Sequence, residues 1–192
     1  MSRRLCPSCQ RPESRCFCGY VCPIANQIEV LLLQHPDEHQ HPKNTGELLA
    51  RNLRSCRLHI AETLDSATAQ TLLAPNTALL YPSLPEAATA ETKQALPERV
   101  ERLVVLDATW RKSRKMLFLN PALAALPRVS LTETPDSLYR IRSAAKRNQL
   151  STFEASCYAL QQLEGDATLC QPALAAFTDY MNHLASFDPN RS

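Results

Sequence analysis

The sequence predicts an α/β domain with a largely parallel sheet and helices on both of its faces. From residue 28 onward, short apolar runs typical of buried parallel strands alternate with helix-forming segments. The chain has 192 residues, of which 44% are hydrophobic and 21% charged, a size and composition that suit one ordinary core with a small appendage. We therefore predict a cysteine-rich knuckle over residues 1–24 and an α/β domain over residues 25–192.

Each element is predicted from its hydrophobic pattern and its flanking residues. Strands are expected over residues 28–33, 57–60, 77–81, 102–106 and 128–131. Helices are expected over residues 47–54, 66–73, 110–119, 151–163 and 169–186. Residues 84–97, rich in Pro, Ala and Glu, and the basic residues 139–150 are expected to be loops. The run that ends at Asp107 is the most convincing core strand.

Four closely spaced cysteines near the start of the chain predict a metal site. Cys6 and Cys9 are spaced C-x2-C, Cys16 and Cys18 are spaced C-x-C, and six residues separate the two pairs. Four thiolates with this spacing can surround one tetrahedral structural Zn²⁺. A disulfide cluster is the alternative, and a reducing compartment would disfavour it. Cys22 is an alternative to Cys18 as the fourth ligand.

Charge and composition exclude several classes of protein. The first residues lack the apolar stretch of a secretory signal, and no run of about 18 apolar residues occurs, so we expect a cytoplasmic protein without a membrane segment. The net charge of +2 excludes binding of nucleic acid by bulk electrostatics and allows a local basic face. With only three glycines, the chain has no G-x-G-x-x-G loop for a Rossmann-type cofactor.

Asp107, Thr109 and Trp110 directly follow the strongest predicted strand, at the carboxyl edge where open α/β sheets bind ligands. Four basic residues come next: Arg111, Lys112, Arg114 and Lys115. An acid, a stacking ring and a phosphate-attracting helix would thus lie together. The alternative from spacing alone is that Asp107 caps the helix and Trp110 fills the core.

Polar residues precede two further predicted helices. Ser151 and Glu154 have the S-x-x-E spacing of a capping box, and the same helix start could also attract the carboxylate of a ligand. Asn44 and Thr45 precede another helix and could act likewise. Three histidines, His35, His39 and His41, lie in a Pro-rich stretch, where we expect solvated side chains and no second metal site.

These motifs together resemble the DTW-domain family, which is named after an Asp-x-Thr-Trp sequence that follows a hydrophobic strand. The resemblance covers about residues 6 to 160 and keeps the order of the motifs. It rests on Cys6, Cys9, Cys16 and Cys18, on Asn44-Thr45-Gly46, on Tyr81-Pro82-Ser83, on Asp107-Ala108-Thr109-Trp110, on Tyr139-Arg140-x-Arg142, and on Ser151-Thr152-x-Glu154-Ala155.

The resemblance implies an enzyme that transfers the 3-amino-3-carboxypropyl group of S-adenosylmethionine to N3 of a tRNA uridine and releases methylthioadenosine. It also implies a SPOUT-like domain with a C-terminal trefoil knot, which the hydrophobic pattern does not predict. Two alternatives are a SPOUT-type RNA methyltransferase and a non-catalytic zinc-knuckle RNA-binding protein. The expected partner is tRNA, and a monomer and a homodimer are both compatible with the sequence.

Site residues follow from the motifs. Asp107 is the candidate base, because a partly desolvated carboxylate beside Val105 and Leu106 suits proton transfer; Thr109 and Trp110 complete the catalytic group. The residues expected to bind S-adenosylmethionine are Asn44, Thr45, Tyr81, Pro82, Ser83, Leu106, Asp107, Ser151, Thr152 and Glu154. The residues expected to bind RNA are Arg111, Lys115, Arg140, Arg142, Lys146 and Arg147.

Overall fold

A five-stranded parallel sheet forms the centre of the protein in a computed structural model, which describes residues 4–39, 44–82, 95–131 and 150–187. The strands are β1 (Glu29–Gln34), β2 (Cys56–Ile60), β3 (Thr77–Leu80), β4 (Arg102–Asp107) and β5 (Arg128–Val129). Their order is β2-β1-β4-β3-β5, and every pairing is parallel. All five carboxyl ends therefore meet at one edge of the sheet. In the β1–β4 register, Gln34 lies beside Asp107.

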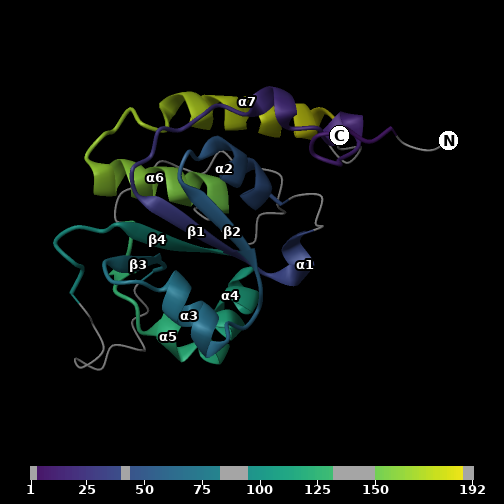
Figure 1. The fold of residues 1–192 in the computed structure, drawn as a ribbon. Helices are drawn as coiled ribbons and strands as arrows, with labels where there is room; N and C mark the ends of the chain where they lie inside the picture. The colour runs from purple at the N-terminus through teal and green to yellow at the C-terminus, as the bar shows by residue number, and fades with distance from the viewer. Residues whose placement is uncertain (1–3, 40–43, 83–94, 132–149, 188–192) are drawn as a thin grey trace.

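Helices cover both faces of this sheet, as the sequence predicts (Figure 1). They are α1 (Pro36–His39), α2 (Gly46–Asn52), α3 (Ser66–Leu72), α4 (Trp110–Leu119), α5 (Pro121–Ala124), α6 (Thr152–Glu164) and α7 (Gln171–Ser186). In the view of Figure 1, α2, α6 and α7 lie above the sheet, and α3, α4 and α5 lie below it. The predicted strands and helices all occur, with ends shifted by up to two residues.

The core is divided in two by the sheet. Because successive side chains of a strand point to opposite faces, Val30 and Leu32 join the cluster with α2, α6 and α7, whereas Leu31 and Leu33 join the cluster with α4 and α5. The central strands are thus buried on both faces, which explains why β1 reads as an uninterrupted apolar run. The edge strand β2 is mostly exposed.

The single-turn helices α1 and α5 were not predicted, because one turn is too short to show a hydrophobic period. Helix α1 follows β1 directly and places His35 in a buried position, so the expectation of a solvated side chain is wrong for this histidine. His35 Nδ1 accepts the Asp37 N–H at 3.2 Å, and its Nε2 lies 3.1 Å from Glu62 Oε1. His39 is exposed, as expected, and His41 lies outside the described residues.

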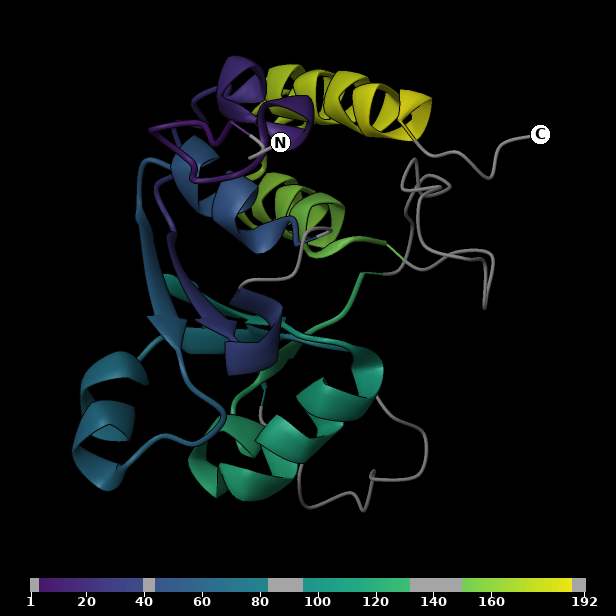
Figure 2. The same ribbon diagram turned by 90° about the vertical axis from the view of Figure 1, so that its right-hand side faces the viewer.

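The cysteine-rich segment packs against the far end of the chain. Its two 3-10 helices, Glu13–Arg15 and Cys18–Tyr20, lie beside α7 (Figure 2). The Phe17 ring is fully buried, 6.3 Å from the ring of Tyr180, whose hydroxyl donates to the Arg15 carbonyl at 3.0 Å. Phe17 belongs to the same core cluster as α6 and α7. The core is therefore continuous across the predicted boundary at residues 24 and 25, which itself stays a prediction.

Two further expectations concern the whole chain. Within the described ranges, none of the helices is both long and apolar enough to cross a membrane. Residues 132–149 lie outside the described residues, so the trefoil knot and the SPOUT-like topology stay predictions. Most of the expected loop over residues 84–97 also lies outside them.

Candidate active site

Asp107 lies at the carboxyl end of β4, where its side chain joins three distant parts of the chain. Its Oδ2 accepts hydrogen bonds from Gln34 Nε2 at 2.8 Å and Asn44 Nδ2 at 2.7 Å, and its Oδ1 accepts one from Thr152 Oγ1 at 2.8 Å. Only 6% of the residue is exposed. The donors come from the end of β1, the segment before α2 and the first turn of α6. A buried carboxylate with these partners is well suited to hold the three segments together.

Asn44 connects this carboxylate to the start of α2. Besides its bond to Asp107, its Nδ2 donates to the Glu38 carbonyl at 3.0 Å. Its Oδ1 accepts the backbone N–H groups of Gly46 at 2.8 Å and Glu47 at 3.3 Å. Asn44 therefore caps α2, while the side chain of Thr45, which is also buried, makes no capping bond. Of the two predicted residues, Asn44 therefore contacts Asp107 as part of a structural cap, and Thr45 is buried next to it in the sequence.

Gly46 permits the close approach of α2 to Asp107. A Cβ atom at this position would lie 2.3 Å from Asp107 Oδ2 and 3.1 Å from Gln34 Nε2. The first distance is shorter than real Cβ contacts, and the second would require the Gln34 amide to shift by a few tenths of an ångström. The Asn-Thr-Gly motif thus has a steric reason for its glycine.

The start of α6 contains the predicted capping box. Ser151 Oγ accepts the Glu154 N–H at 3.2 Å, and Glu154 Oε2 accepts the Ser151 N–H at 2.9 Å. Glu154 is completely buried, so its carboxylate stabilises the helix start from inside the protein. Thr152, the first residue of the helix, is thereby held where its hydroxyl reaches Asp107.

The Trp110 side chain is about half exposed, so the alternative in which it fills the core is wrong. It is 48% exposed and meets the buried Tyr81 edge to face, with ring centroids 5.6 Å apart. Thr109, and not Asp107, caps α4, since its Oγ1 accepts the Lys112 N–H at 3.4 Å. The Arg128 guanidinium lies 5.3 Å from the centre of the Tyr81 ring. Trp110 therefore offers a free aromatic face at the carboxyl edge of the sheet.

The remaining residues predicted to bind S-adenosylmethionine are placed as follows. Leu106 is buried in the core cluster that contains α4 and α5. The exposed Pro82 directly follows Tyr81, and its carbonyl accepts a hydrogen bond from Arg128 at 3.2 Å. Ser83 lies outside the described residues. A cavity of about 460 Å³ lies between α3 and the α4–α5 turn, and no predicted site residue lines it.

Among the basic residues of α4, Lys112 and Lys115 form ion pairs with acidic side chains. Lys112 Nζ lies 2.8 Å from Glu38 Oε1, and this hydrogen bond is the main reason why the pKa of Lys112 is raised. Lys115 Nζ lies 2.8 Å from Glu62 Oε1, and its hydrogen bond, followed by that of His35, lowers the pKa of Glu62. Arg111 and Arg114 are exposed and have no ion pair among the described residues.

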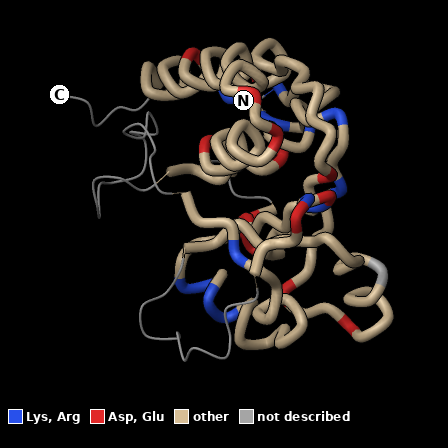
Figure 3. Tube along the Cα trace, turned by 90° about the vertical axis from the view of Figure 1, so that its left-hand side faces the viewer, with Lys and Arg blue, Asp and Glu red and all other residues tan. Residues whose placement is uncertain are grey.

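Lysines and arginines do not cover one whole side of the protein. In Figure 3 they are spread over the upper half of the view and along its right-hand side, and they occur again in the lower left part. Arg140, Arg142, Lys146 and Arg147, which the sequence analysis assigns to RNA binding, lie outside the described residues.

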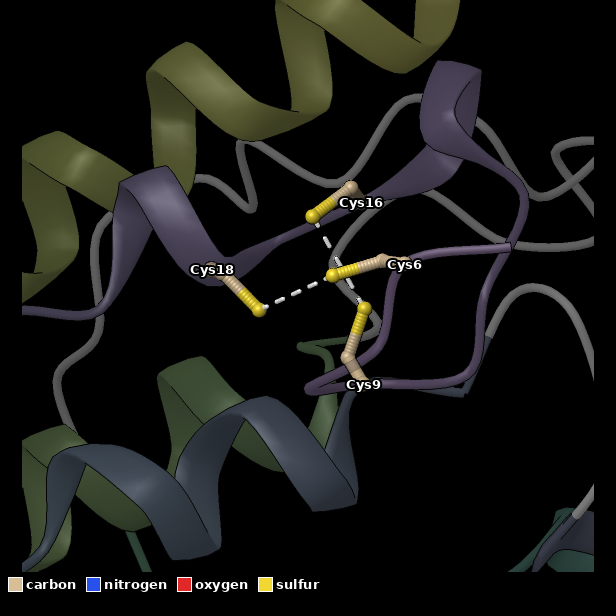
Figure 4. Close-up of side chains that lie close together, drawn as sticks. All are labelled: Cys6, Cys9, Cys16 and Cys18. Carbon is tan, nitrogen blue, oxygen red and sulfur yellow. Dashed lines mark hydrogen bonds between the residues drawn. The ribbon is translucent and has the colours of Figure 1, made fainter. Parts of the chain in front are cut away.

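Cys6, Cys9, Cys16 and Cys18 converge as the spacing predicts, with all four sulfur atoms within 4.8 Å of one another (Figure 4). The Sγ atoms of Cys6 and Cys18 are 3.8 Å apart, as are those of Cys9 and Cys16. Tetrahedral coordination with bonds of about 2.3 Å would separate the sulfur atoms by ~3.8 Å. Cys22 is outside the group, so Cys18 is the fourth member. These four cysteines could hold a metal ion.

The backbone around the cluster favours a thiolate at one position. Hydrogen bonds from the backbone of Cys9 and Ser8 lower the pKa of Cys6 to about 6. Burial has the opposite effect on Cys16 and raises the pKa of its thiol to about 12. Bound metal would itself stabilise the thiolate form of all four ligands.

Arg11 connects the cysteine cluster to the Asp107 site. Its backbone carbonyl accepts the Cys6 N–H at 2.8 Å, and its side chain donates to the Asn44 carbonyl at 3.0 Å. The guanidinium also lies 4.7 Å from the centre of the Phe17 ring. Arg11 and Gln34 are the site residues that the sequence analysis missed. Only the position of Gln34 at a strand end could have indicated its role.

Comparison with known proteins decides the family. A sequence model of the DTW domain matches residues 3–185. The chain belongs to the DTW-domain family. Its relatives include tRNA-uridine aminocarboxypropyltransferase 2 of Macaca fascicularis and of Mus musculus, each 27% identical over 192 residues and 94% of this chain. A further relative is tRNA-uridine aminocarboxypropyltransferase A of Arabidopsis thaliana, 32% identical over 135 residues and 60% of this chain.

The DTW-domain relatives are longer proteins than this chain. The match spans 64% of each mammalian relative and 50% of the plant relative. No solved structure matches the chain. Family membership therefore rests on the sequence match, and the arrangement of the motifs rests on the geometry described above.

The contact at Gly46 predicts that Gly46→Ala destabilises the protein, although helix propensity alone favours alanine. We expect the free energy of unfolding to fall by about 1–3 kcal/mol, because the new methyl group displaces the Asp107 carboxylate. Gly19→Ala, where a Cβ meets nothing within 4 Å, is the matched control and should change stability by less than about 0.5 kcal/mol. Urea unfolding followed by circular dichroism measures both. Equal stability of Gly46→Ala and wild type would contradict the contact.

The three donors around Asp107 predict that Asp107→Ala lowers stability as well as activity. We expect a loss of about 2–4 kcal/mol, because the amides of Gln34 and Asn44 lose a buried charged acceptor. Asp65→Ala, which removes an exposed cap of α3, is the control and should cost about 1 kcal/mol. If Asp107→Ala were as stable as wild type and inactive, Asp107 would act on the substrate and not as a structural centre.

Proposed function

We propose that this protein transfers the 3-amino-3-carboxypropyl group of S-adenosylmethionine to N3 of a uridine in tRNA. One observation supports this most: the Asn44, Asp107 and Thr152 segments, each part of a DTW-family motif, meet through hydrogen bonds at the carboxyl edge of the sheet. Three relatives of the chain are named tRNA-uridine aminocarboxypropyltransferases. Helix α4, which starts at that edge, also carries a half-exposed aromatic ring and two arginines that form no ion pair within the described part of the chain.

The reaction sets clear demands on the protein. S-adenosylmethionine supplies a carbon that its sulfonium already activates. Uridine N3 gives up its proton and forms a bond to that carbon, while the sulfur keeps the electron pair of the broken bond and leaves as methylthioadenosine. The protein must therefore orient both molecules, promote loss of the proton and exclude attack at the methyl carbon.

We assign Asp107, Thr109 and Trp110 to the reaction centre, with Asp107 as a positioning residue. Both of its carboxylate oxygens accept hydrogen bonds from side chains, and it is nearly inaccessible to solvent. To act as a general base, Asp107 would need one of these hydrogen-bond donors to move away from its carboxylate. This role stays a prediction. Trp110 has the free face needed to stack on uracil or adenine, a contact worth about 1–3 kcal/mol.

The proposed S-adenosylmethionine site lies around the starts of α4 and α6. Tyr81, Pro82 and Ser83 would border it on the β3 side, and Leu106 would border it at the end of β4. Ser151 and Thr152 stand at the N-terminus of α6, whose partial positive charge suits the carboxylate of the donor. Asn44, Thr45 and Glu154 are buried, so we propose that they act by fixing the backbone.

For RNA, we propose that Arg111, Lys115, Arg140, Arg142, Lys146 and Arg147 bind phosphates, which makes tRNA binding depend on salt. The SPOUT-like topology with a trefoil knot and a cytoplasmic location belong to the same proposal. We further propose that the four-cysteine cluster holds zinc, because four thiolates at tetrahedral spacing form a closed structural site.

The proposed activity predicts a specific pair of products. The full chain, incubated with S-adenosylmethionine and unmodified tRNA, should release methylthioadenosine in equal amount to the aminocarboxypropyl uridine formed. Chromatography with mass spectrometry of the digested tRNA measures both. S-adenosylhomocysteine with a methylated nucleoside would instead identify a methyltransferase, and no product with intact tRNA binding would identify a non-catalytic RNA-binding protein.

The metal site predicts one zinc ion per chain in the purified protein. Cys9→Ser should lose most of the zinc and melt at a lower temperature, because metal binding contributes free energy to folding of the knuckle. Cys22→Ser, which changes a nearby cysteine outside the cluster, should keep the zinc content of wild type. Elemental analysis and thermal melts provide the data. Iron in place of zinc, or equal loss in both variants, would contradict the assignment.

A further inference from the structure

Helix α4 has one buried face and one exposed face. Its buried residues are Ser113, Met116 and Leu117. Six residues of α4 are exposed, and one of them, Leu119, is the last residue of the helix. Successive residues of a helix are rotated by about 100°, so the other five fall within an arc of about 140° on the side opposite the buried residues. They are Trp110, Arg111, Arg114, Lys115 and Phe118. We call these five residues the α4 face.

Two aromatic rings of the α4 face are open to solvent. Phe118 is 84% exposed and Trp110 is 48% exposed, so the packing of the core explains the position of neither ring fully. One exposed apolar side chain is ordinary on a protein surface. Arg114 lies between the two rings, one helical turn from each, and this alternation of ring, cation and ring distinguishes the face.

The basic residues of α4 differ in whether they form ion pairs, depending on the side of the helix on which they lie. Lys112, outside the α4 face, is held by Glu38 and Asp37 and anchors α4 to α1. Lys115, at the margin of the α4 face, pairs with Glu62. Arg111 and Arg114 have no acidic partner among the described residues. The centre of the face therefore carries uncompensated positive charge beside exposed rings.

We propose that the α4 face binds a single-stranded segment of the RNA substrate, with Trp110 and Phe118 stacking on bases and Arg111 and Arg114 contacting phosphates. Rings that stack on bases next to cations that follow a phosphate backbone are the combination by which proteins hold single strands without base-specific contacts. This inference rests on the proposed function, because it takes RNA as the substrate.

The geometry gives this strand a direction. Trp110 is three residues from Asp107, at the proposed reaction centre, and Phe118 is eight residues further along α4, a rise of about 12 Å. The bound segment would run from the reacting uridine along the helix to Phe118. Phe118 and Arg114 would then bind nucleotides that take no part in the reaction, so they determine affinity and leave the chemical step unchanged.

The closing experiment compares Phe118→Ala and Arg114→Ala with two matched controls. Phe187→Ala removes an aromatic ring that is 55% exposed at the end of α7, and Arg99→Ala removes an exposed arginine before β4. Two probes serve: an unmodified tRNA transcript and oligouridylate. Binding is followed by quenching of Trp110, which is the only tryptophan of the chain. Circular dichroism verifies that each variant is folded.

We expect Phe118→Ala to weaken binding of both probes by about 5- to 100-fold, because one stacking contact is lost. Arg114→Ala should weaken binding and reduce the slope of affinity against salt by about one. Both controls should bind like wild type. At saturating tRNA, the rate of methylthioadenosine release should stay within about twofold of wild type in all four variants.

Three outcomes would overturn the proposal. The first is wild-type affinity in Phe118→Ala and Arg114→Ala while tRNA is still modified, which refutes the α4 face and leaves the proposed function intact. The second is a difference in molecular mass between the two variants and wild type, measured by light scattering, with unchanged RNA affinity. That result would make the α4 face a contact between protein chains. The third is an equal loss of RNA affinity in the controls Phe187→Ala and Arg99→Ala. Failure of wild type to modify any tRNA would refute the proposed function, and the affinities would still test the α4 face.

Discussion

The structure depends most on the buried carboxylate of Asp107 and its three side-chain donors. Removing a charged carboxylate from water is costly unless hydrogen bonds replace the lost solvation, and here Gln34, Asn44 and Thr152 supply them. The donors come from β1, from the segment before α2 and from α6. One side chain at the end of β4 therefore fixes the relative positions of elements that lie far apart in the sequence, and the DTW, Asn-Thr-Gly and Ser-Thr-x-Glu motifs become parts of one arrangement.

The same arrangement links the four-cysteine cluster to the proposed reaction centre. Arg11, between the two cysteine pairs, donates to the carbonyl of Asn44, whose amide holds Asp107. Side-chain packing supports this path, because Phe17 and Tyr180 fix the knuckle against α7. A metal held by all four sulfur atoms would have no open position for catalysis, so the proposed zinc would contribute to the structure only. The knuckle is best understood as a support for Asn44, continuous with the core of the domain.

Much of this could be predicted from the sequence, because the signals are local. Hydrophobic runs located the strands, cysteine spacing located the metal cluster, and the S-x-x-E spacing predicted the cap of α6. The partners of Asp107 could not be predicted, because strand register and helix packing decide which residues meet it. The alternative in which Asp107 caps α4 is wrong, because Thr109 performs the cap; both residues lie at the strand end, and only the backbone geometry separates them. Arg11 gave no local signal.

Helix α4 shows how one element can serve two purposes. Thr109 fixes its first turn, and the ion pair of Lys112 with Glu38 holds it against α1. These contacts use the residues that face the protein. They leave Trp110 at the sheet edge and Phe118 two turns away on a rigid scaffold, so the positions of both rings follow from the anchoring of the helix. A strand bound along α4 would thus be aligned with Asp107 by the same contacts that fold the domain. For this reason, the anchoring of α4 is expected to decide where a bound strand lies relative to Asp107, while the exposed side chains of the helix decide how tightly the strand is held.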